Sequence, residues 1–333
     1  MHDKVLTGFS SDKKCGICPH FCVIGDNFKG ICGGRELAGG SVYSSNYAIV
    51  SSIAVDPVEK KPLYHFHPSE KILSVGTFGC NMKCFFCQNW QISQTVPSSF
   101  REIQPYELVD SAVSNKTPMI AFTYSEPIVW YDYVYDCASA AKENNIKTVM
   151  VSNGFINEKP LEKLYPLIDA WNIDLKAFNV KSYQTLGGQL DIVKNTIAFL
   201  SGKTHLELTT LVVPGFNDSF AELKEMAEWI ASIDQNIPWH LSRYFPAYKS
   251  SAPPTGEEYL VHLYSKFSSM LNYVYLGNTR NGIGCDTKCP RCGNIVIERK
   301  GYTVDICSID GGSCAKCGHK QNIVFGGSNG RNN

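Results

Sequence analysis

The middle of the chain alternates short apolar runs with longer amphipathic stretches. Runs of the length of buried strands occur near Lys71–Thr77, Pro118–Tyr124, Ile146–Val151, Ala170–Leu175, His205–Val213 and Pro238–Arg243. Between them, apolar residues recur at helical spacing in Tyr106–Asn115, Pro127–Asn144, Lys159–Leu167, Leu190–Ser201 and Ser219–Ile233. This alternation is typical of repeated βα units around a parallel sheet. We therefore expect an α/β fold with a partial barrel of six βα units, open on one side.

Polar residues follow each of the six predicted strands. In barrels of this kind, the loops at the carboxyl ends of the strands converge on one mouth, where function lies. In chain order, the loops after the first, second, third and fifth strands supply Cys80, Cys84 and Cys87; Glu126; Ser152 and Asn153; and Gly215 and Asn217. The fourth strand ends at Asp174-Leu175-Lys176, and the sixth carries His240 and Arg243. We therefore expect one functional site built from several loops.

The first of these loops carries three cysteines within eight residues. Cys80, Cys84 and Cys87 follow the spacing C-x3-C-x2-C, with Phe86 directly before the third. A [4Fe–4S] cubane usually takes four thiolates, so three leave one iron open to a small ligand. The spacing differs from the C-x2-C of a zinc knuckle and from the run of bacterial ferredoxins. The alternative is a zinc site with a fourth ligand from elsewhere.

S-adenosylmethionine (SAM) suits an open iron, because its amino and carboxylate groups can chelate the metal. An electron from the cluster can then break the sulfonium bond and release a 5′-deoxyadenosyl radical. SAM and iron–sulfur clusters are among the cofactors that carry radical chemistry.

The loop residues offer groups that match the parts of SAM. Hydroxyls of the ribose can bond to Ser152, Asn153, Asp174 and His240. The ammonium can pair with Glu126, and the carboxylate can pair with Lys176 or Arg243. The adenine edge can bind to backbone groups beside Phe86. Simpler interpretations stay open: a surface ion pair for Asp174 and Lys176, a helix cap for Glu126, a structural role for His240, and a brace of the barrel for Arg243.

The three-cysteine motif with Phe86 resembles that of the radical SAM superfamily. The core, about residues 70–245, is similar to the pyruvate formate-lyase activating enzyme group, which implies SAM contacts from Asp174, Lys176 and His240. Ser125-Glu126-Pro127 stands where many members carry Gly-Gly-Glu.

Nearly the whole chain resembles the radical SAM proteins of the AmmeMemoRadiSam system. This resemblance is carried by Cys15–Arg35, Phe122–Pro127, Val151–Gly154 and Ser242–Pro246. Well-understood relatives activate glycyl radical enzymes by removing a glycine hydrogen. The resemblance does not indicate the substrate of this chain.

Two further groups of cysteines flank the predicted barrel. Cys289, Cys292, Cys314 and Cys317 form two C-x2-C knuckles, which predict a zinc ribbon whose strands are Asn294–Arg299 and Tyr302–Ile306. The N-terminal group consists of Cys15, Cys18, Cys22 and Cys32. Its thiolates suit zinc and an iron–sulfur cluster equally. We expect a cysteine-rich module with a β segment in residues 1–69, the barrel in 70–280, and the zinc-ribbon-like module and tail in 281–333.

Composition narrows the class of protein. The 333 residues are 44% hydrophobic and 19% charged, with zero formal net charge, which argues against nucleic acid as a partner. No apolar run approaches the ~20 residues of a membrane span, and the first residues lack a signal peptide core. We expect a cytoplasmic protein, where 14 cysteines indicate metal binding rather than disulfides.

These observations predict a radical SAM enzyme that cleaves SAM at a [4Fe–4S] cluster and abstracts hydrogen from a protein or small molecule. It would need an electron donor such as a flavodoxin or ferredoxin. The resemblance implies an oxidoreductase that activates a glycyl radical enzyme. The alternatives are radical modification of an RNA base or metabolite, and a non-catalytic binding or redox-sensing protein with iron–sulfur and zinc sites.

Overall fold

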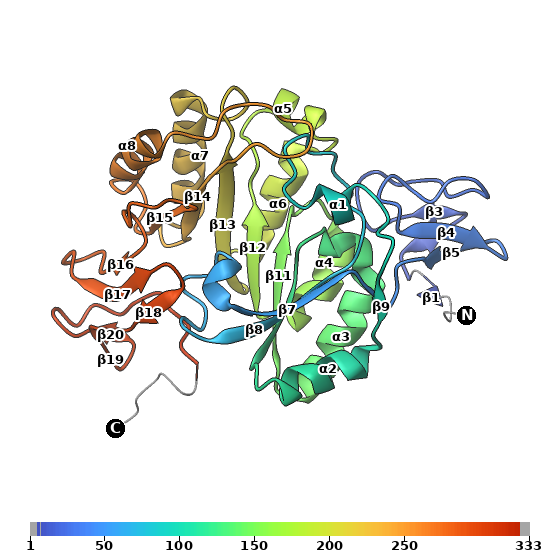
Figure 1. Ribbon diagram of the computed structural model, residues 1–333, viewed down its shortest axis with the longest axis horizontal. Helices are drawn as coiled ribbons and strands as arrows, with labels where there is room; N and C mark the ends of the chain where they lie inside the picture. The colour runs from blue at the N-terminus through green and yellow to red at the C-terminus, as the bar shows by residue number, and fades with distance from the viewer. Residues whose placement is uncertain (1–4, 7, 327–333) are drawn as a thin grey trace.

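The centre of the protein is a twisted sheet built from eight of the described strands (Figure 1). The structure is a computed structural model that describes residues 5–6 and 8–326. In spatial order the strands are β15 (Val274–Gly277), β14 (Trp239–Arg243), β13 (His205–Val212), β12 (Ala170–Asp174), β11 (Lys147–Ser152), β10 (Met119–Phe122), β8 (Lys71–Gly76) and β7 (Ser52–Pro57). All neighbours pair in parallel except β7, which is antiparallel to β8. The predicted α/β fold is confirmed.

The six predicted strands are all present, and the sheet continues beyond them on both sides. At one edge, Trp239 of β14 pairs with Val274 of β15, a seventh parallel strand. At the other edge, β7 adds an antiparallel strand. Nearly all residues of the inner strands β10, β11 and β12 are buried.

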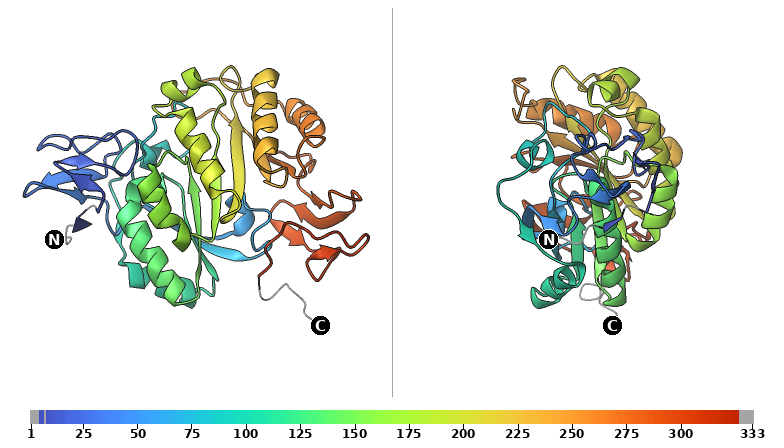
Figure 2. Two further views of the ribbon diagram at one scale, coloured as in Figure 1. Left: turned by 180° about the vertical axis from the view of Figure 1, so that it is seen from behind. Right: turned by 90° about the vertical axis from the view of Figure 1, so that its right-hand side faces the viewer.

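Helices cover one face of the sheet, as the view from behind shows (Figure 2). The longer ones are α2 (Pro105–Ser114), α3 (Tyr131–Glu143), α4 (Glu158–Leu164), α6 (Leu190–Leu200), α7 (Phe220–Ile233) and α8 (Glu257–Phe267). Short ones lie in the connections: α1 (Trp90–Ser93), α5 (Val180–Thr185), η1 (Val58–Lys60), η2 (Pro127–Trp130) and η3 (Tyr165–Leu167). No helix among the described residues is long and apolar enough to cross a bilayer.

A small β module precedes the barrel and lies at one end of the molecule (Figures 1 and 2). Its strands are β1 (Val5–Leu6), β2 (Ser10–Ser11), β3 (Lys14–Cys15), β4 (Arg35–Ala38) and β5 (Ser41–Ser44). The strands β4, β5 and β1 form one antiparallel sheet, and β2 pairs with β3. A separate pair, β6 (Ile49–Val50) with β9 (Arg101–Glu102), joins this region to the barrel.

The C-terminal module lies at the opposite end (Figures 1 and 2). It contains β16 (Thr287–Lys288), β17 (Ile295–Lys300), β18 (Thr303–Asp305), β19 (Ile309–Asp310) and β20 (Ser313–Cys314). The antiparallel pair of β17 and β18 confirms the strands predicted between the two cysteine knuckles. The first residues, 1–4 and 7, and the predicted tail, 327–333, lie outside the described residues.

The segment between β7 and β8 crosses the lower part of the barrel. Asn172 of β12 donates from Nδ2 to the carbonyl of Pro62 at 2.7 Å. Glu207 of β13 accepts from the backbone N–H groups of Tyr64 at 3.0 Å and His65 at 2.8 Å. Both ring nitrogens of His65 are bonded within the protein, to Asn322 and Tyr275. Residues 59–65 therefore form a floor beneath the strands, which we call the barrel floor.

Candidate functional site

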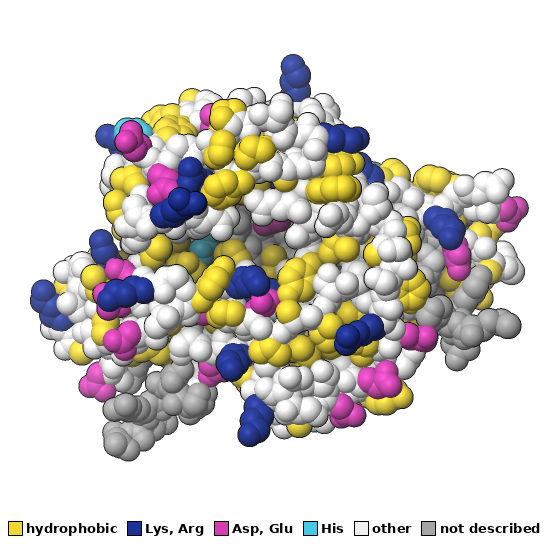
Figure 3. Space-filling view, in the orientation of Figure 1, with side chains coloured by type: hydrophobic (Ala, Val, Ile, Leu, Met, Phe, Trp, Pro, Cys, Tyr) yellow, Lys and Arg dark blue, Asp and Glu magenta, His cyan; other side chains and the backbone are white. Residues whose placement is uncertain are grey.

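A cavity of about 470 Å³ lies on the face of the sheet that the helices leave open, where the surface is hollowed (Figure 3). Of the residues predicted for the site, those that line it are Cys80, Cys84, Phe86, Cys87, Glu126, Asn153, Asp174, Lys176 and His240. All except His240 lie at or after the carboxyl ends of β8, β10, β11 and β12, as expected. His240 is the second residue of β14, and the register of the sheet places it level with Thr209 of β13 and Asp174 at the end of β12. The barrel floor closes the cavity below with Glu59, Pro62 and Tyr64.

The three cysteines of the first loop open into this cavity. Cys84 is buried, and Cys80 and Cys87 are half-buried. Burial raises the pKa of the Cys84 thiol to about 11, although the nearby Lys176 ammonium lowers it. A thiol in such surroundings stays protonated unless a metal binds it, since coordination to a metal removes the thiol proton. The environment therefore suits metal ligands rather than free thiolates.

Phe86 packs beneath the loop instead of standing free in the cavity. It is 4% exposed, and its ring lies 4.9 Å from that of Phe85 and 5.3 Å from that of Phe216. Asn153, which follows β11, contacts the same loop. Its Nδ2 lies 3.8 Å from the sulfur of Cys80 and 2.8 Å from Oδ1 of Asn81. These contacts fix the backbone that carries the cysteines.

Glu126 caps a helix and lines the cavity at the same time. Its carboxylate accepts from the N–H groups of Ile128 at 3.0 Å and Asn153 at 2.8 Å, and from the hydroxyl of Ser152 at 2.8 Å. Burial raises the pKa of Glu126 to about 7, although these hydrogen bonds and the charge of Lys176 act to lower it. The hydroxyl of Ser152 also accepts from the N–H of Gly154. Ser152 therefore supports Glu126 and does not itself line the cavity.

Asp174 and Lys176 form an ion pair in the cavity wall. Nζ of Lys176 lies 2.8 Å from Oδ2 of Asp174, and the two side chains are 18% and 36% exposed, respectively. Burial would lower the pKa of Lys176, but Asp174 and the neighbouring Cys84 raise it, so the ammonium stays charged. The pair is real, but it faces the cavity rather than the outer surface.

His240 is held by a carboxylate that the sequence analysis did not single out. Its Nε2 lies 2.6 Å from Oε2 of Glu207, a fully buried residue of β13. Burial would raise the pKa of Glu207, but hydrogen bonds from His205 and His240 hold it well below its usual range. Because Nε2 faces Glu207, His240 has Nδ1 left for a ligand. The sequence did offer a signal for Glu207, because a charged residue within a predicted buried strand is unusual.

Arg243 lies outside the cavity. Its guanidinium pairs with Glu257 at 2.5 Å and donates from Nε to the carbonyl of Thr255 at 2.8 Å. This geometry fits the simpler interpretation from the sequence, in which Arg243 braces the barrel.

Four polar side-chain atoms in the cavity wall have no hydrogen-bond partner: Glu59 Oε2, Ser125 Oγ, Asn172 Oδ1 and Thr209 Oγ1. A buried polar group without a partner costs about 1–3 kcal/mol, so four in one wall indicate a polar ligand. Amine, hydroxyl and adenine groups of SAM match such atoms, and the cavity volume is in the range of sites for ligands of that size. The residues present therefore fit SAM.

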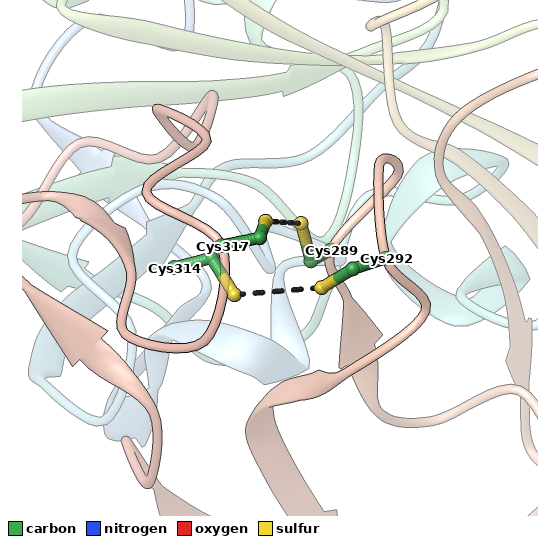
Figure 4. A group of neighbouring side chains, drawn as sticks. All are labelled: Cys289, Cys292, Cys314 and Cys317. Atoms are coloured by element: carbon green, nitrogen blue, oxygen red, sulfur yellow. Dashed lines mark hydrogen bonds between the residues drawn. The ribbon is translucent and has the colours of Figure 1, made fainter.

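The C-terminal cysteines form a closed quartet (Figure 4). The sulfurs of Cys289 and Cys317 are 3.6 Å apart, those of Cys292 and Cys314 are 3.8 Å apart, and all four lie within 4.8 Å of one another. Four thiolates around one tetrahedral zinc, with Zn–S bonds of about 2.3 Å, have edges of about 3.8 Å. The arrangement fits a single metal ion. Cys285 and Cys307 do not belong to it.

Comparisons with known proteins indicate the family of the chain. The family model of the radical SAM superfamily matches residues 74–230. An uncharacterised protein of Methanocaldococcus jannaschii is 38% identical over 94% of this chain and 96% of its own length. The pyruvate formate-lyase 1-activating enzyme of Escherichia coli is 25% identical over 54% of this chain and 77% of its own length.

A solved structure shows the same fold. The crystal structure of Streptococcus suis SuiB bound to S-adenosylmethionine superimposes with a TM-score of 0.52 at 15% identity, covering 67% of this chain and 53% of that one. The chain therefore belongs to the radical SAM superfamily, whose members use a [4Fe–4S] cluster and SAM.

Proposed function

We propose that the protein cleaves SAM reductively at a [4Fe–4S] cluster bound by Cys80, Cys84 and Cys87, and that the resulting 5′-deoxyadenosyl radical abstracts hydrogen from a substrate. The observation that carries this proposal is the shared cavity. The three cysteines line the same cavity as Asp174, Lys176 and four side chains whose buried polar atoms have no hydrogen-bond partner. A cluster with one open iron would thus meet its ligand inside a polar wall.

The residues of the chain would bind and orient SAM from several sides. The Lys176 ammonium can receive the SAM carboxylate, and Glu126 can receive its ammonium. Asp174, Asn153 and Nδ1 of His240 can bond to the ribose hydroxyls. Each of these side chains is itself held by a neighbour, which limits its movement and keeps the ligand in one orientation.

The likeness to the Escherichia coli activating enzyme supports a finer proposal, in which the substrate is a glycine of a partner protein. A small polar substrate is the second candidate, favoured by the barrel floor. There, Glu59 is a lining residue that is 4% exposed, and its buried Oε2 has no hydrogen-bond partner. Zero net charge argues against RNA as the substrate.

We also propose zinc for the C-terminal quartet and an external electron donor of the flavodoxin or ferredoxin type. The sulfur separations support zinc, as they match the edges of a tetrahedral site. The donor is required because each SAM cleavage consumes one electron.

The test is the formation of 5′-deoxyadenosine and methionine from SAM after anaerobic reconstitution and reduction with dithionite. We expect product from the wild type and none from the Cys80→Ala/Cys84→Ala/Cys87→Ala variant. The exposed Cys307, outside all three cysteine groups, gives a matched control as Cys307→Ala, which should cleave SAM as the wild type does. A wild type that holds its cluster and binds SAM but releases no product under these conditions would instead support the non-catalytic alternative.

A further inference from the structure

We propose that the hydroxyl of Ser93 donates a hydrogen bond to the thiolate sulfur of Cys87 and thereby raises the reduction potential of the cluster. Ser93 acts through Cys87, so it is a positioning residue for the reduction of the cluster. The inference deepens the proposed function and rests on it in one respect, the presence of a cluster at Cys80, Cys84 and Cys87.

Ser93 is the last residue of α1, the short helix that follows the three cysteines. Its Oγ is 3.1 Å from the sulfur of Cys87, and the residue is 3% exposed. A serine in a helix commonly bonds to the carbonyl four residues earlier. Ser139 does so, because its hydroxyl donates to the carbonyl of Tyr135 at 2.9 Å. The hydroxyl of Ser93 instead contacts a sulfur that the sequence predicts to be a cluster ligand.

The direction of this hydrogen bond follows from the chemistry of its two partners. Between a thiol and a hydroxyl, either atom could donate. A cysteine that binds iron is a thiolate and has no proton to give, so the hydroxyl of Ser93 is then the donor. Gln94 supports this assignment, because its Nε2 donates to Oγ of Ser93 at 3.4 Å and leaves the hydroxyl proton for the sulfur.

The helix that carries Ser93 is tied to the cysteine loop by the residues on either side of Ser93. The N–H of Gly79 donates to the carbonyl of Ile92 at 2.8 Å. On the other side, Nε2 of Gln94 donates to the carbonyl of Met82 at 3.2 Å. The hydroxyl is therefore held near the sulfur in advance, and little rearrangement is needed when the charge on the sulfur changes.

A hydrogen bond to a cluster sulfur stabilises the reduced state of the cluster more than the oxidised state. Reduction adds one negative charge, which is shared with the cysteine sulfurs, and a donor interacts more strongly with a more negative acceptor. Hydrogen bonds to the sulfurs are accordingly among the factors that set the potentials of iron–sulfur clusters. Because Ser93 is buried, little water screens this interaction.

Other groups also donate to the sulfurs of the loop. The sulfur of Cys80 accepts from the backbone N–H of Met82 at 3.3 Å and lies 3.8 Å from Nδ2 of Asn153. A backbone N–H remains when a side chain is replaced, and Asn153 also holds Asn81. The hydroxyl of Ser93 can be removed with fewer other changes, so its effect on the potential can be measured by itself.

The hydrogen bond would act on the first of two electron transfers. A reduced donor of the flavodoxin or ferredoxin type gives one electron to the cluster and is itself oxidised. The same electron then breaks the sulfonium C–S bond of SAM, which gives methionine and the 5′-deoxyadenosyl radical. A higher potential of the cluster makes the first transfer more favourable, so Ser93 would bring the cluster within reach of its donor.

The test is a redox titration of the reconstituted cluster without SAM, followed by electron paramagnetic resonance. At a fixed potential, we expect Ser93→Ala to lower the ratio of reduced to oxidised cluster about tenfold, a shift of about 59 mV to lower potential for one electron. The iron content should not change. Ser139→Ala is the matched control, since it removes a helical serine hydroxyl that bonds to a carbonyl. A potential of Ser93→Ala equal to that of the wild type would overturn the inference.

A second pair of variants separates the hydroxyl from packing. Threonine and valine are both β-branched, so Ser93→Thr and Ser93→Val differ mainly in the hydroxyl. We expect the ratio of reduced to oxidised cluster to be about tenfold higher in Ser93→Thr than in Ser93→Val at the same potential. Equal ratios in this pair would overturn the inference even where Ser93→Ala loses its cluster.

Failure of this inference and failure of the proposed function give different results. SAM cleavage by the wild type together with an unchanged potential in Ser93→Ala would refute the role of Ser93 alone. A potential shift in Ser93→Ala without SAM cleavage by the wild type would refute the proposed function and leave the role of Ser93 standing. A wild type that binds no iron at Cys80, Cys84 and Cys87 would refute both.

Discussion

The carboxylate of Glu207 connects segments that lie far apart in the chain. It accepts from the backbone of Tyr64 and His65 and bonds to the rings of His205 at 2.9 Å and His240 at 2.6 Å. A buried charge with this many donors is satisfied, so it holds the barrel floor and the candidate SAM-binding histidine in fixed positions.

Asp174 should matter for SAM and not for iron. We predict that Asp174→Ala weakens SAM binding by about tenfold, or about 1.4 kcal/mol, because the cavity loses an acceptor and the partner of Lys176. The iron content should not change. Asp169→Ala is the matched control, since Asp169 pairs with Lys147 at the same 2.8 Å but lies before β12, at its other end. Equal SAM affinity in both variants would remove Asp174 from the site.

His65 should make stability depend on pH. Burial lowers the pKa of His65 to about 3, so the folded state keeps it neutral, with Nδ1–H donating to Asn322 and Nε2 accepting from Tyr275. In the unfolded state the histidine has a pKa of about 6.5 and binds a proton below that pH. The stability of the folded state therefore decreases as the pH is lowered. When the pH is lowered from about 7.5 to about 5.5, protonation of His65 in the unfolded state should reduce the free energy of unfolding by about 1.4 kcal/mol.

The measurement is urea unfolding of the anaerobic holoprotein at both pH values. The pH effect should shrink by that amount in His65→Gln and persist in His262→Gln, since His262 is exposed. An unchanged pH effect in His65→Gln would show that His65 is not held neutral.

At the residue scale, sequence reasoning predicted several residues that line the cavity and missed others that line it too. Cys80 follows β8 and Asp174 ends β12, and polar residues are conspicuous at such positions. Asn172 and Thr209 lie inside apolar strands, and their role depends on which way each strand faces. The closure of the barrel decides which side chains of a strand point into the cavity, and short apolar runs in the sequence do not reveal this.

At the scale of elements, the strongly apolar strands were predictable and the edges were not. The strand β15 is four residues long and follows a connection rich in proline and serine, so its pattern is too short to stand out. The antiparallel β7 contains Asp56, which pairs with Lys60 and Lys61. Edge strands carry such charges because one side meets solvent, and their alternation is weak.

The loop after β8 should depend on one glycine. Gly79 has a positive φ of 94°, and a side chain there would strike the carbonyl of Cys32. We predict that Gly79→Ala displaces the loop and lowers both bound iron and SAM cleavage at least about tenfold. Gly215→Ala is the control, with a positive φ of 75° but open space around it. Similar losses in both variants would mean that backbone strain alone, and not the contact with the N-terminal module, explains the effect.

At the scale of the molecule, both end modules contact the barrel, and the C-terminal one also lines the cavity. The N-terminal module packs against Gly79, whereas the C-terminal module contributes Tyr302 to the wall. Arg299 of that module donates to the carbonyl of Tyr64 at 2.8 Å and lies over its ring. The cysteine spacings indicated two modules, but their contacts with the barrel involve residues far apart in the chain, which sequence pattern alone could not place.

Removal of the C-terminal metal should destabilise that module without removing iron. We predict that Cys292→Ser/Cys317→Ser loses about one zinc per chain, keeps its iron and unfolds at a Tm lower by about 5 °C or more. The small core around Val296 and Ile297 cannot hold the module by itself. Cys307→Ser is the control. Loss of iron together with zinc would refute the separation of the two sites.

The most direct test of the central claim is whether SAM binds the open iron of the cluster at Cys80, Cys84 and Cys87. The measurement is electron–nuclear double resonance on the reduced protein, with SAM isotopically labelled at its amino nitrogen and carboxylate oxygens. We expect hyperfine coupling from both labelled groups to the cluster. A cluster that is reduced in the presence of bound SAM but shows no coupling to either label would contradict the account.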